Sequence, residues 1–183
     1  MPLEREIKLR FATVDEAKQR ILSSSLEATP LRGRRLQEDS LLDTLDNQLF
    51  HRGSTLRVRS ELGHSLLTFK GPVQPGLVKI REEHETVVGD GAMVSTILSE
   101  LGLRVWFRYE KYREELAAGD LVIAIDETPI GVFVEIEGSE AHIERAAAAL
   151  GKTPADYITA SYRTLFVEHC HERGIEPRDM LFR

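Results

Sequence analysis

The stretch EREIKLRF, residues 4–11, alternates charged and apolar side chains from Glu6 onward, and this pattern decides the fold prediction. Side chains of a β-strand point alternately to its two faces, so a period of two predicts a strand with one charged and one apolar face. The charged face carries, in order, Glu4, Glu6, Lys8 and Arg10.

The same alternation recurs along the chain and predicts about eight strands. They cover residues 4–11, 36–43, 54–60, 65–70, 78–88, 106–115, 121–127 and 132–137. Further segments show apolar residues at helical spacing, capping residues or a terminal glycine. These predicted helices cover residues 13–26, 90–101, 139–150 and 153–173.

Most neighbouring strands have no helix between them, which is typical of an antiparallel sheet. No long linker rich in proline or serine divides the chain, and 183 residues are most simply one domain. We therefore predict an α+β protein, with residues 1–183 in a single domain and with an antiparallel sheet that is curled or closed.

The composition restricts the classes of function. Lys plus Arg number 24 and Asp plus Glu number 30, so the formal net charge is −6. Such a field repels phosphate backbones and anionic surfaces, so we expect no nucleic-acid and no membrane partner. The single cysteine, Cys170, excludes an internal disulfide framework and a multi-cysteine metal site. The charged N-terminal residues contain no apolar signal core, so we expect a cytoplasmic protein.

Charge recurs on one face of nearly every predicted strand, whereas Ser, Thr and Gln are sparse there. On any single strand, an ordinary solvent-exposed face explains such charges. Carboxylates at the ends of apolar strands, such as Asp126 after residues 121–125, fit that explanation poorly. If the sheet closes, seven cations and seven carboxylates converge on one lumen. They are Lys8, Arg57, Arg59, Lys70, Arg81, Lys111 and Arg113, with Glu4, Glu6, Glu83, Glu85, Asp126, Glu135 and Glu137.

This mixture of charges predicts a particular chemistry. Guanidinium and ammonium groups bind the oxygens of a multiply charged phosphate chain. Carboxylates suit Mg²⁺ or Mn²⁺, which take oxygen ligands and share them with phosphates. No glycine-rich phosphate loop of the Walker type is present. The pattern therefore indicates a site for a polyphosphate and a divalent metal ion.

Several short motifs, in this order, resemble the CYTH superfamily of triphosphate tunnel metalloenzymes. Residues 4–8 fit its E-x-E-x-K signature. The later matches are LRVR at 56–59, FKG at 69–71, R-x-E-x-E at 81–85, K-x-R at 111–113, Asp126-Glu127, FVEIE at 133–137 and Ser161-Tyr162. The resemblance spans nearly the whole chain, and it implies an eight-stranded antiparallel closed barrel with helices packed outside.

The resemblance also implies roles for single residues. The seven cations would grip the phosphates of a triphosphate-bearing small molecule, and Lys8, Glu83 and Lys111 would take part in catalysis. The metal ligands, for Mg²⁺ or Mn²⁺, would be Glu4, Glu6, Glu85, Asp126, Glu135 and Glu137. Glu83 and Glu85 could each instead orient a basic neighbour.

Three functions fit these motifs. The first is a metal-dependent hydrolase of triphosphates, either inorganic tripolyphosphate or a nucleoside or thiamine triphosphate. The second is a class IV adenylate cyclase that converts ATP to cyclic AMP and pyrophosphate. The third is a non-catalytic module that binds polyphosphate or nucleotide. The sequence leaves the oligomeric state open, a homodimer included.

Three further segments are interpreted, the first of them by its departure from the family pattern. Many relatives carry Y-F-D-T where this chain has Leu41-Leu42-Asp43-Thr44, so Leu41 replaces the tyrosine, which weakens assignment as a thiamine triphosphatase. The basic run Arg32-Gly33-Arg34-Arg35 is interpreted as a solvated loop near the mouth of the lumen. Trp106 and Phe107 are interpreted as packing residues rather than as a platform for a base, and no motif that reads a purine is evident.

Overall fold

A computed structural model of the protein describes residues 3–182. The strands are β1 (Leu3–Phe11), β2 (Thr29–Thr44), β3 (Thr55–Glu61), β4 (His64–Lys70), β5 (Lys79–Val88), β6 (Leu103–Ala118), β7 (Leu121–Thr128) and β8 (Gly131–Glu137). The helices are α1 (Val14–Ser23), α2 (Gln48–His51), α3 (Gly91–Glu100), α4 (Glu140–Ala149), a short 3₁₀ turn (Pro154–Asp156) and α5 (Tyr162–Glu172).

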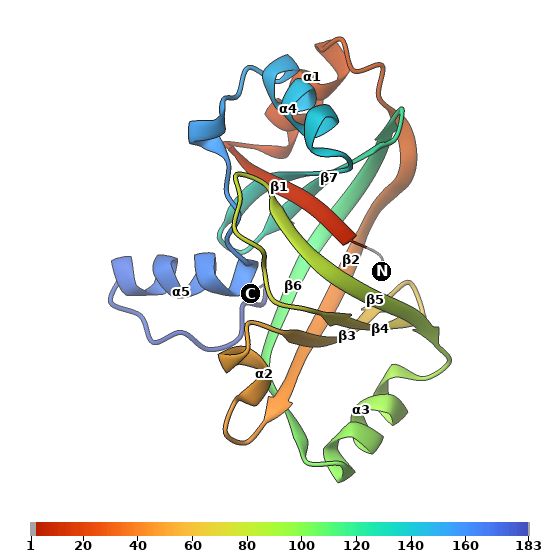
Figure 1. Ribbon diagram of the computed structural model, residues 1–183, viewed down its shortest axis with the longest axis vertical. Coiled ribbons are helices and arrows are strands. Elements are labelled where there is room, and N and C mark those ends of the chain that lie inside the picture. The colour runs from red at the N-terminus through yellow and green to blue at the C-terminus, as the bar shows by residue number, and fades with distance from the viewer. Residues whose placement is uncertain (1–2, 183) are drawn as a thin grey trace.

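The strands close into an antiparallel barrel in the order β1-β5-β4-β3-β2-β6-β7-β8 (Figure 1). Strand β1 completes the ring because it pairs with β5 through residues 3–6 and with β8 through residues 6–11. The predicted α+β fold with an eight-stranded closed barrel and outer helices is thus confirmed. Among residues 3–182, no helix is long and apolar enough to cross a membrane.

The apolar core lies outside the barrel wall. Ile7 and Leu9 of β1 point away from the lumen, and they pack with Ile123 of β7, Ile21 of α1 and Ile143 of α4, all of them fully buried. Figure 1 shows α1 and α4 together over this end of the barrel. Burial of these side chains against the helices stabilises the wall, and it leaves the opposite, charged face of each strand for the interior.

A second apolar cluster lies where α5 meets the barrel. Leu41, Phe107 and Phe133 share the parity of the inward-facing charged residues, and they pack with Tyr162 and Leu165 of α5. The cluster therefore covers one end of the charged interior with aromatic and aliphatic side chains.

The interpretation of residues 32–35 as a solvated loop is wrong. These residues belong to β2, which begins at Thr29 and pairs with β6 over its whole length. Register shifts between Pro30 and Arg35 make the pairing irregular, and this irregularity interrupts the period of two in the sequence. Arg32 and Arg34 are exposed, but Arg35 is buried.

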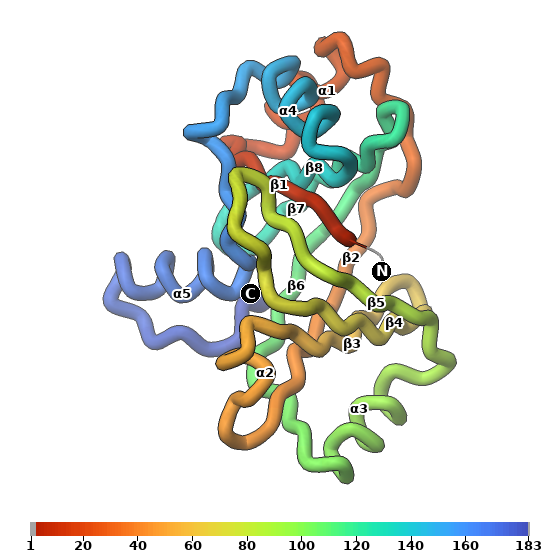
Figure 2. The backbone as a smooth tube through the Cα atoms, in the orientation of Figure 1, coloured from red at the N-terminus to blue at the C-terminus, as the bar shows by residue number. Residues whose placement is uncertain are grey.

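The predicted single helix over residues 153–173 is also wrong. Thr153 and Asp156 form a capping box around Pro154 that supports only the short 3₁₀ turn. The backbone then extends, and Ile158 exchanges two backbone hydrogen bonds of 2.9 Å with Lys8. Figure 2 shows this segment passing β1 between α4 and α5. Ser161 caps α5 by accepting a hydrogen bond from the Thr164 amide, so pairing with β1 replaces a helical turn.

Candidate active site

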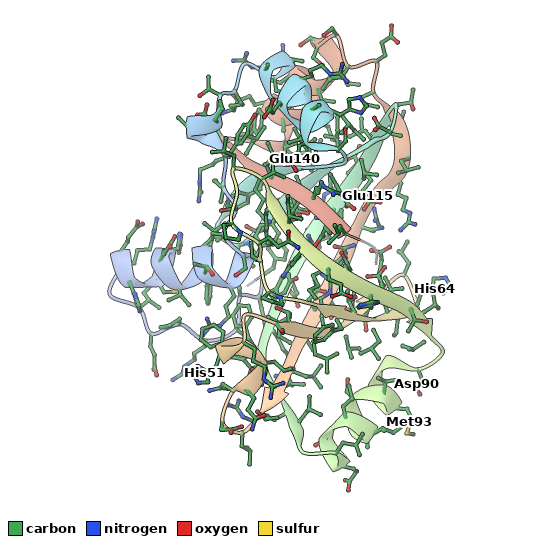
Figure 3. All side chains as sticks on the ribbon, in the orientation of Figure 1. His51, His64, Asp90, Met93, Glu115 and Glu140 are labelled. Atoms are coloured by element: carbon green, nitrogen blue, oxygen red, sulfur yellow. The ribbon has the colours of Figure 1, made fainter. Side chains whose placement is uncertain are left out.

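The barrel encloses a central cavity of about 700 Å³. All seven cations predicted from the sequence line it, and so do six of the seven carboxylates, Asp126 being the exception. Figure 3 shows side chains crowding the interior of the barrel, with Glu115 among them, while His51 and Met93 lie on outer helices. The strand periodicity therefore brings the predicted site residues to one place.

Asp126 lies beneath the cavity surface and anchors three neighbours. Its carboxylate accepts hydrogen bonds from Lys111 at 2.7 Å, from Arg113 at 2.7 and 2.6 Å, and from the Tyr162 hydroxyl at 2.7 Å. Burial opposes ionisation of Asp126, but Arg113 and Lys111 outweigh it and lower the pKa of this carboxyl. Because both oxygens are occupied, Asp126 holds the cations in position.

Two ammonium groups share one oxygen of Glu6. The Nζ atoms of Lys8 and Lys79 lie 3.0 and 2.7 Å from Glu6 Oε1, and Lys8 also lies 3.3 Å from Glu135. Burial works against the charge on Lys8, but Glu6 and Glu135 outweigh it and raise the pKa of its ammonium group. Burial and the charge of Lys8 lower the pKa of Lys79 to about 8.

A carboxylate of β2 orients the two arginines of β3. Asp39 is buried and accepts hydrogen bonds of 2.8 and 3.0 Å from Arg59, and the Nε atom of Arg57 lies 3.4 Å away. On its other side Arg57 approaches Glu85 at 3.4 Å, and Glu85 accepts a bond of 2.8 Å from Thr68. A buried carboxylate between two guanidinium groups fixes their orientation toward the cavity.

Carboxylates gather at one mouth of the cavity. Glu4 binds Lys70 at 2.6 Å and Arg81 at 3.2 Å, and Lys70 also reaches Glu83 at 3.0 Å. Glu137 lies beside this group, opposite Glu6 in the register of β1 and β8. Within residues 3–182, Glu137 has no ion-pair partner. Glu137 is exposed at the mouth, but partial desolvation and the like charges of Glu4 and Glu6 raise its pKa to about 7.

The mouth has the chemistry that a divalent metal ion requires, although its carboxylates are not gathered into a ready site. Within residues 3–182, no three His, Cys, Asp or Glu side chains are arranged as a metal centre. The donors are nevertheless all oxygen atoms, which Mg²⁺ and Mn²⁺ prefer. Glu137 has no ion pair within residues 3–182, and the negative charges of Glu4 and Glu6 nearby contribute to raising its pKa. The carboxylates Glu4, Glu6 and Glu137 therefore fit a hard divalent ion.

Sequence reasoning missed several charged residues of the cavity. Arg35 pairs with Glu61 at 2.7 Å and with Glu115 at 2.8 Å, and Lys79 pairs with Glu6. The signal was present, because Lys79 is in phase with Arg81, and Glu115 is in phase with Lys111 and Arg113. Arg35, Gln37 and Asp39 likewise alternate along β2, and all three are buried.

Leu41, which replaces the family tyrosine, lies in the apolar cluster near α5. It supplies no hydroxyl group for Lys8. Instead, the Nζ atoms of Lys8 and Lys111 lie over the ring of Tyr162, at 5.2 and 4.8 Å from its centroid. The lysines thus contact an aromatic face from α5 and carboxylates from the barrel.

The chain is similar to several known proteins. A "putative adenylate cyclase" from Methanocaldococcus jannaschii is 31% identical over 107 residues, which are 58% of this chain and 61% of that protein. The alignment thus spans less than two thirds of that relative. The structure of a "putative adenylate cyclase" from Vibrio parahaemolyticus superposes with a TM-score of 0.77 at 21% identity, over 89% of this chain and 97% of the other.

A Hippeastrum protein, described as a "putative adenylyl cyclase" with a dominant triphosphatase activity, superposes with a TM-score of 0.69 at 18% identity. The superposition covers 97% of this chain and 98% of that one. At these identities the two solved structures show a shared fold. The family description "CYTH domain" matches residues 2–162, which is most of the chain. The protein therefore belongs to the CYTH domain family.

Proposed function

We propose that this protein is a metal-dependent hydrolase of triphosphate-containing small molecules. One observation carries the proposal: cations and carboxylates from seven of the eight strands, β7 being the exception, line a single cavity of about 700 Å³. Burying so many charges is costly unless they are paired or hold a ligand. A triphosphate, with negative oxygens along its length, complements the cations of this cavity.

The cations would bind the phosphate oxygens by exchanging internal partners for the substrate. Arg57, Arg59 and Arg113 present planar donor groups whose orientation is already fixed by buried carboxylates. Such preorganised donors stabilise charge that develops on phosphoryl oxygens without reorganising during the reaction. Lys8 and Lys111, which also line the cavity, would add compact positive charge.

The hydrolytic step needs a water molecule that attacks phosphorus and a group that accepts its proton. Glu83 is suited to this role because it lines the cavity at the mouth and binds Lys70. Burial raises the pKa of Glu83, which makes it a stronger base than an ordinary carboxylate. The attacking oxygen bonds to the terminal phosphorus, the bond to the bridging oxygen breaks, and Glu83 takes the proton.

The carboxylates Glu4, Glu6 and Glu137 would hold Mg²⁺ or Mn²⁺ together with phosphate oxygens. When bound, the ion neutralises phosphate charge and acts as a Lewis acid. Glu4 and Glu6 also bind cations, so they would share their oxygens between those cations and the ion. We assign the other predicted ligands, Asp126, Glu85 and Glu135, to positioning the cations that they bind.

A class IV adenylate cyclase is the second candidate, because proteins similar in sequence and in fold carry the description "putative adenylate cyclase". In that reaction the ribose 3′-hydroxyl of ATP would attack the α-phosphorus and pyrophosphate would leave. The same cations would serve both reactions. The Hippeastrum protein, which has a similar fold and a dominant triphosphatase activity, supports placing the hydrolase before the cyclase.

Product analysis distinguishes the candidates. The purified protein is incubated with tripolyphosphate, thiamine triphosphate or ATP, each with Mg²⁺ or with Mn²⁺, and the products are identified by phosphorus NMR and chromatography. Orthophosphate is the expected product. Cyclic AMP with pyrophosphate would instead identify a cyclase, and tight binding without turnover would identify a binding module.

A further inference from the structure

The end of the central cavity near α5 differs chemically from the rest. Its lining includes the apolar side chains of Leu41 and Leu42, the aromatic rings of Phe50 and Trp106, and the guanidinium of Arg163. Hydroxyl groups of Ser54, Ser161 and Thr164 also line it. A phosphate chain gains nothing from the apolar side chains, so this end suits a different part of a ligand.

Arg163 is held at this end by aromatic rings instead of by carboxylates. Its guanidinium carbon lies 4.3 Å from the centroid of the Trp106 ring and 5.1 Å from that of Phe50. The two rings contact each other edge to face at 5.5 Å. Three elements, α2, β6 and α5, therefore build one aromatic platform around an arginine.

The charge of Arg163 is not neutralised by the protein. Within residues 3–182, each of the other cavity cations has a carboxylate within 4.0 Å, and Arg163 has none. Partial burial lowers the pKa of its guanidinium, as expected of a cation removed from water without a counter-ion. Because Arg163 makes no hydrogen bond or ion pair within residues 3–182 and contacts only ring faces, its N–H groups remain for a ligand.

Along β6, this platform lies far from the position that is in register with Glu137. Glu137 is the register partner of Val122 in β7, and Val122 is the register partner of Ala117, near the end of β6. Trp106 lies close to the start of β6. An elongated ligand that places its phosphates among the cations can therefore reach the platform with its other end.

We propose that Arg163, Trp106 and Phe50 form a subsite for the neutral, planar base of a nucleoside triphosphate. Bases stack on aromatic rings and on guanidinium planes, and arginine N–H groups donate to their ring nitrogen and carbonyl acceptors. The positive charge of Arg163 disfavours the cationic thiazolium of thiamine triphosphate, and inorganic tripolyphosphate has no group for the platform. This inference rests on the proposed function and narrows its substrate class to nucleoside triphosphates.

Trp106 provides a direct test because it is the only tryptophan of the chain. The full-length protein is titrated with ATP, tripolyphosphate and thiamine triphosphate in the presence of EDTA, which prevents metal-dependent turnover. The fluorescence of Trp106 is excited at the long-wavelength edge of the tryptophan absorption band. Calorimetry measures binding in parallel. We expect ATP to change the emission of Trp106 and tripolyphosphate to bind without that change.

An equal emission change with ATP and tripolyphosphate, or none with bound ATP, would overturn the subsite while leaving the proposed function intact. Binding of neither ligand would overturn both. Thiamine triphosphate that binds as tightly as ATP and changes the emission equally would overturn the preference for a neutral base.

Arg163→Ala tests the subsite by turnover. With Mg²⁺, we expect the ratio of kcat/KM for ATP to that for tripolyphosphate to fall about ten-fold, which corresponds to the loss of a stacking contact. The control is Arg145→Ala, an exposed arginine of α4 outside the cavity lining, which should leave the ratio unchanged. An unchanged ratio in Arg163→Ala would contradict the assignment, and near-native circular dichroism would show that the variant folds.

Discussion

Tyr162, the first residue of α5, donates its hydroxyl hydrogen to Oδ2 of Asp126 at 2.7 Å, and both residues are buried. This bond connects the C-terminal helix to the carboxylate that also holds Lys111 and Arg113. The ring of Tyr162 packs with Phe133 of β8 at a centroid distance of 5.4 Å. The covering of the cavity by α5 and the arrangement of its cations thus depend on one another.

Tyr162→Phe should lower the stability of the fold, although it keeps the aromatic ring that packs in this part of the core. The variant keeps the ring that faces Lys8 and Lys111 but leaves Asp126 without one donor. A hydrogen bond to a charged group contributes about 1.5–3 kcal/mol, so we expect a loss of that order in the free energy of unfolding. Urea denaturation measures it, with Tyr112→Phe, whose ring contacts Arg34 and Phe182, as the control. Equal stability of the two variants would contradict the role of the hydroxyl.

Glu137→Gln should abolish metal-dependent turnover and at the same time stabilise the fold near neutral pH. The raised pKa of Glu137, about 7, means that the folded state disfavours its ionised form. The resulting cost in stability is present above about pH 7 and disappears as pH falls toward the unfolded-state value. Thermal denaturation should therefore show a higher Tm for the variant at pH 8 than for the wild type, and equal values near pH 4.

Full activity of Glu137→Gln would remove this residue from the metal site. A variant that loses activity but shows no gain in Tm at pH 8 would instead contradict the account of like charges around Glu137. Glu127→Gln, on the outer face of β7, where Glu127 pairs with Arg34, is the matched control for both measurements.

Affinity for a triphosphate should decrease as the pH rises from about 7 to about 9. Burial and Arg113 lower the pKa of Lys111 to about 8, and burial with Lys8 does the same for Lys79. Above that pH the ammonium groups lose their protons, so less positive charge faces the phosphates. Calorimetric titration with ATP across this range, without metal, measures the effect. An affinity that stays constant or increases would show that both lysines remain charged.

Arg59→Ala and Arg81→Ala should differ although both remove a cavity cation. Arg59 donates both of its hydrogen bonds to the fully buried Asp39, and its removal leaves this carboxylate only the longer contact of 3.4 Å with Arg57. Breaking a buried ion pair costs about 3–5 kcal/mol. Arg81 lies nearer the mouth and pairs with Glu4, which keeps Lys70 as a partner. We expect Arg59→Ala to lose stability and affinity together, and Arg81→Ala to lose mainly affinity. Equal effects on the urea midpoint would argue against this division.

Much of the fold could be predicted because charged and apolar residues alternate along several strands of the sequence. Along β1, β7 and β8 one face is apolar and packs with residues of α1 and α4. In β1 the other face is charged throughout, so the period of two is clearest there. The E-x-E-x-K motif and the later pairs of basic residues share that phase, which located most of the cavity. The apolar cover built by Leu41 and Phe133 is in the same phase but carries no charge, and it was not anticipated.

The missing parts depend on long-range contacts. Arg35 follows an irregular stretch of β2, and only its partners Glu61 and Glu115 on other strands show that it is buried. The break before α5 arises because Ile158 pairs with Lys8, about 150 residues away in the chain. Trp106 was interpreted as a packing residue, and only the contact with Arg163 places it on a platform facing the cavity.

The account depends most on the claim that the inward-facing cations hold a triphosphate inside the barrel. Calorimetric titration with tripolyphosphate tests it directly, comparing the wild type with Arg57→Ala, from the cavity lining, and with Arg108→Ala, an exposed arginine outside it. We predict one site per chain, affinity at least about ten-fold weaker in Arg57→Ala after loss of a charge-assisted contact, and unchanged affinity in Arg108→Ala. Equal affinity of all three proteins, or no binding by the wild type, would contradict the account.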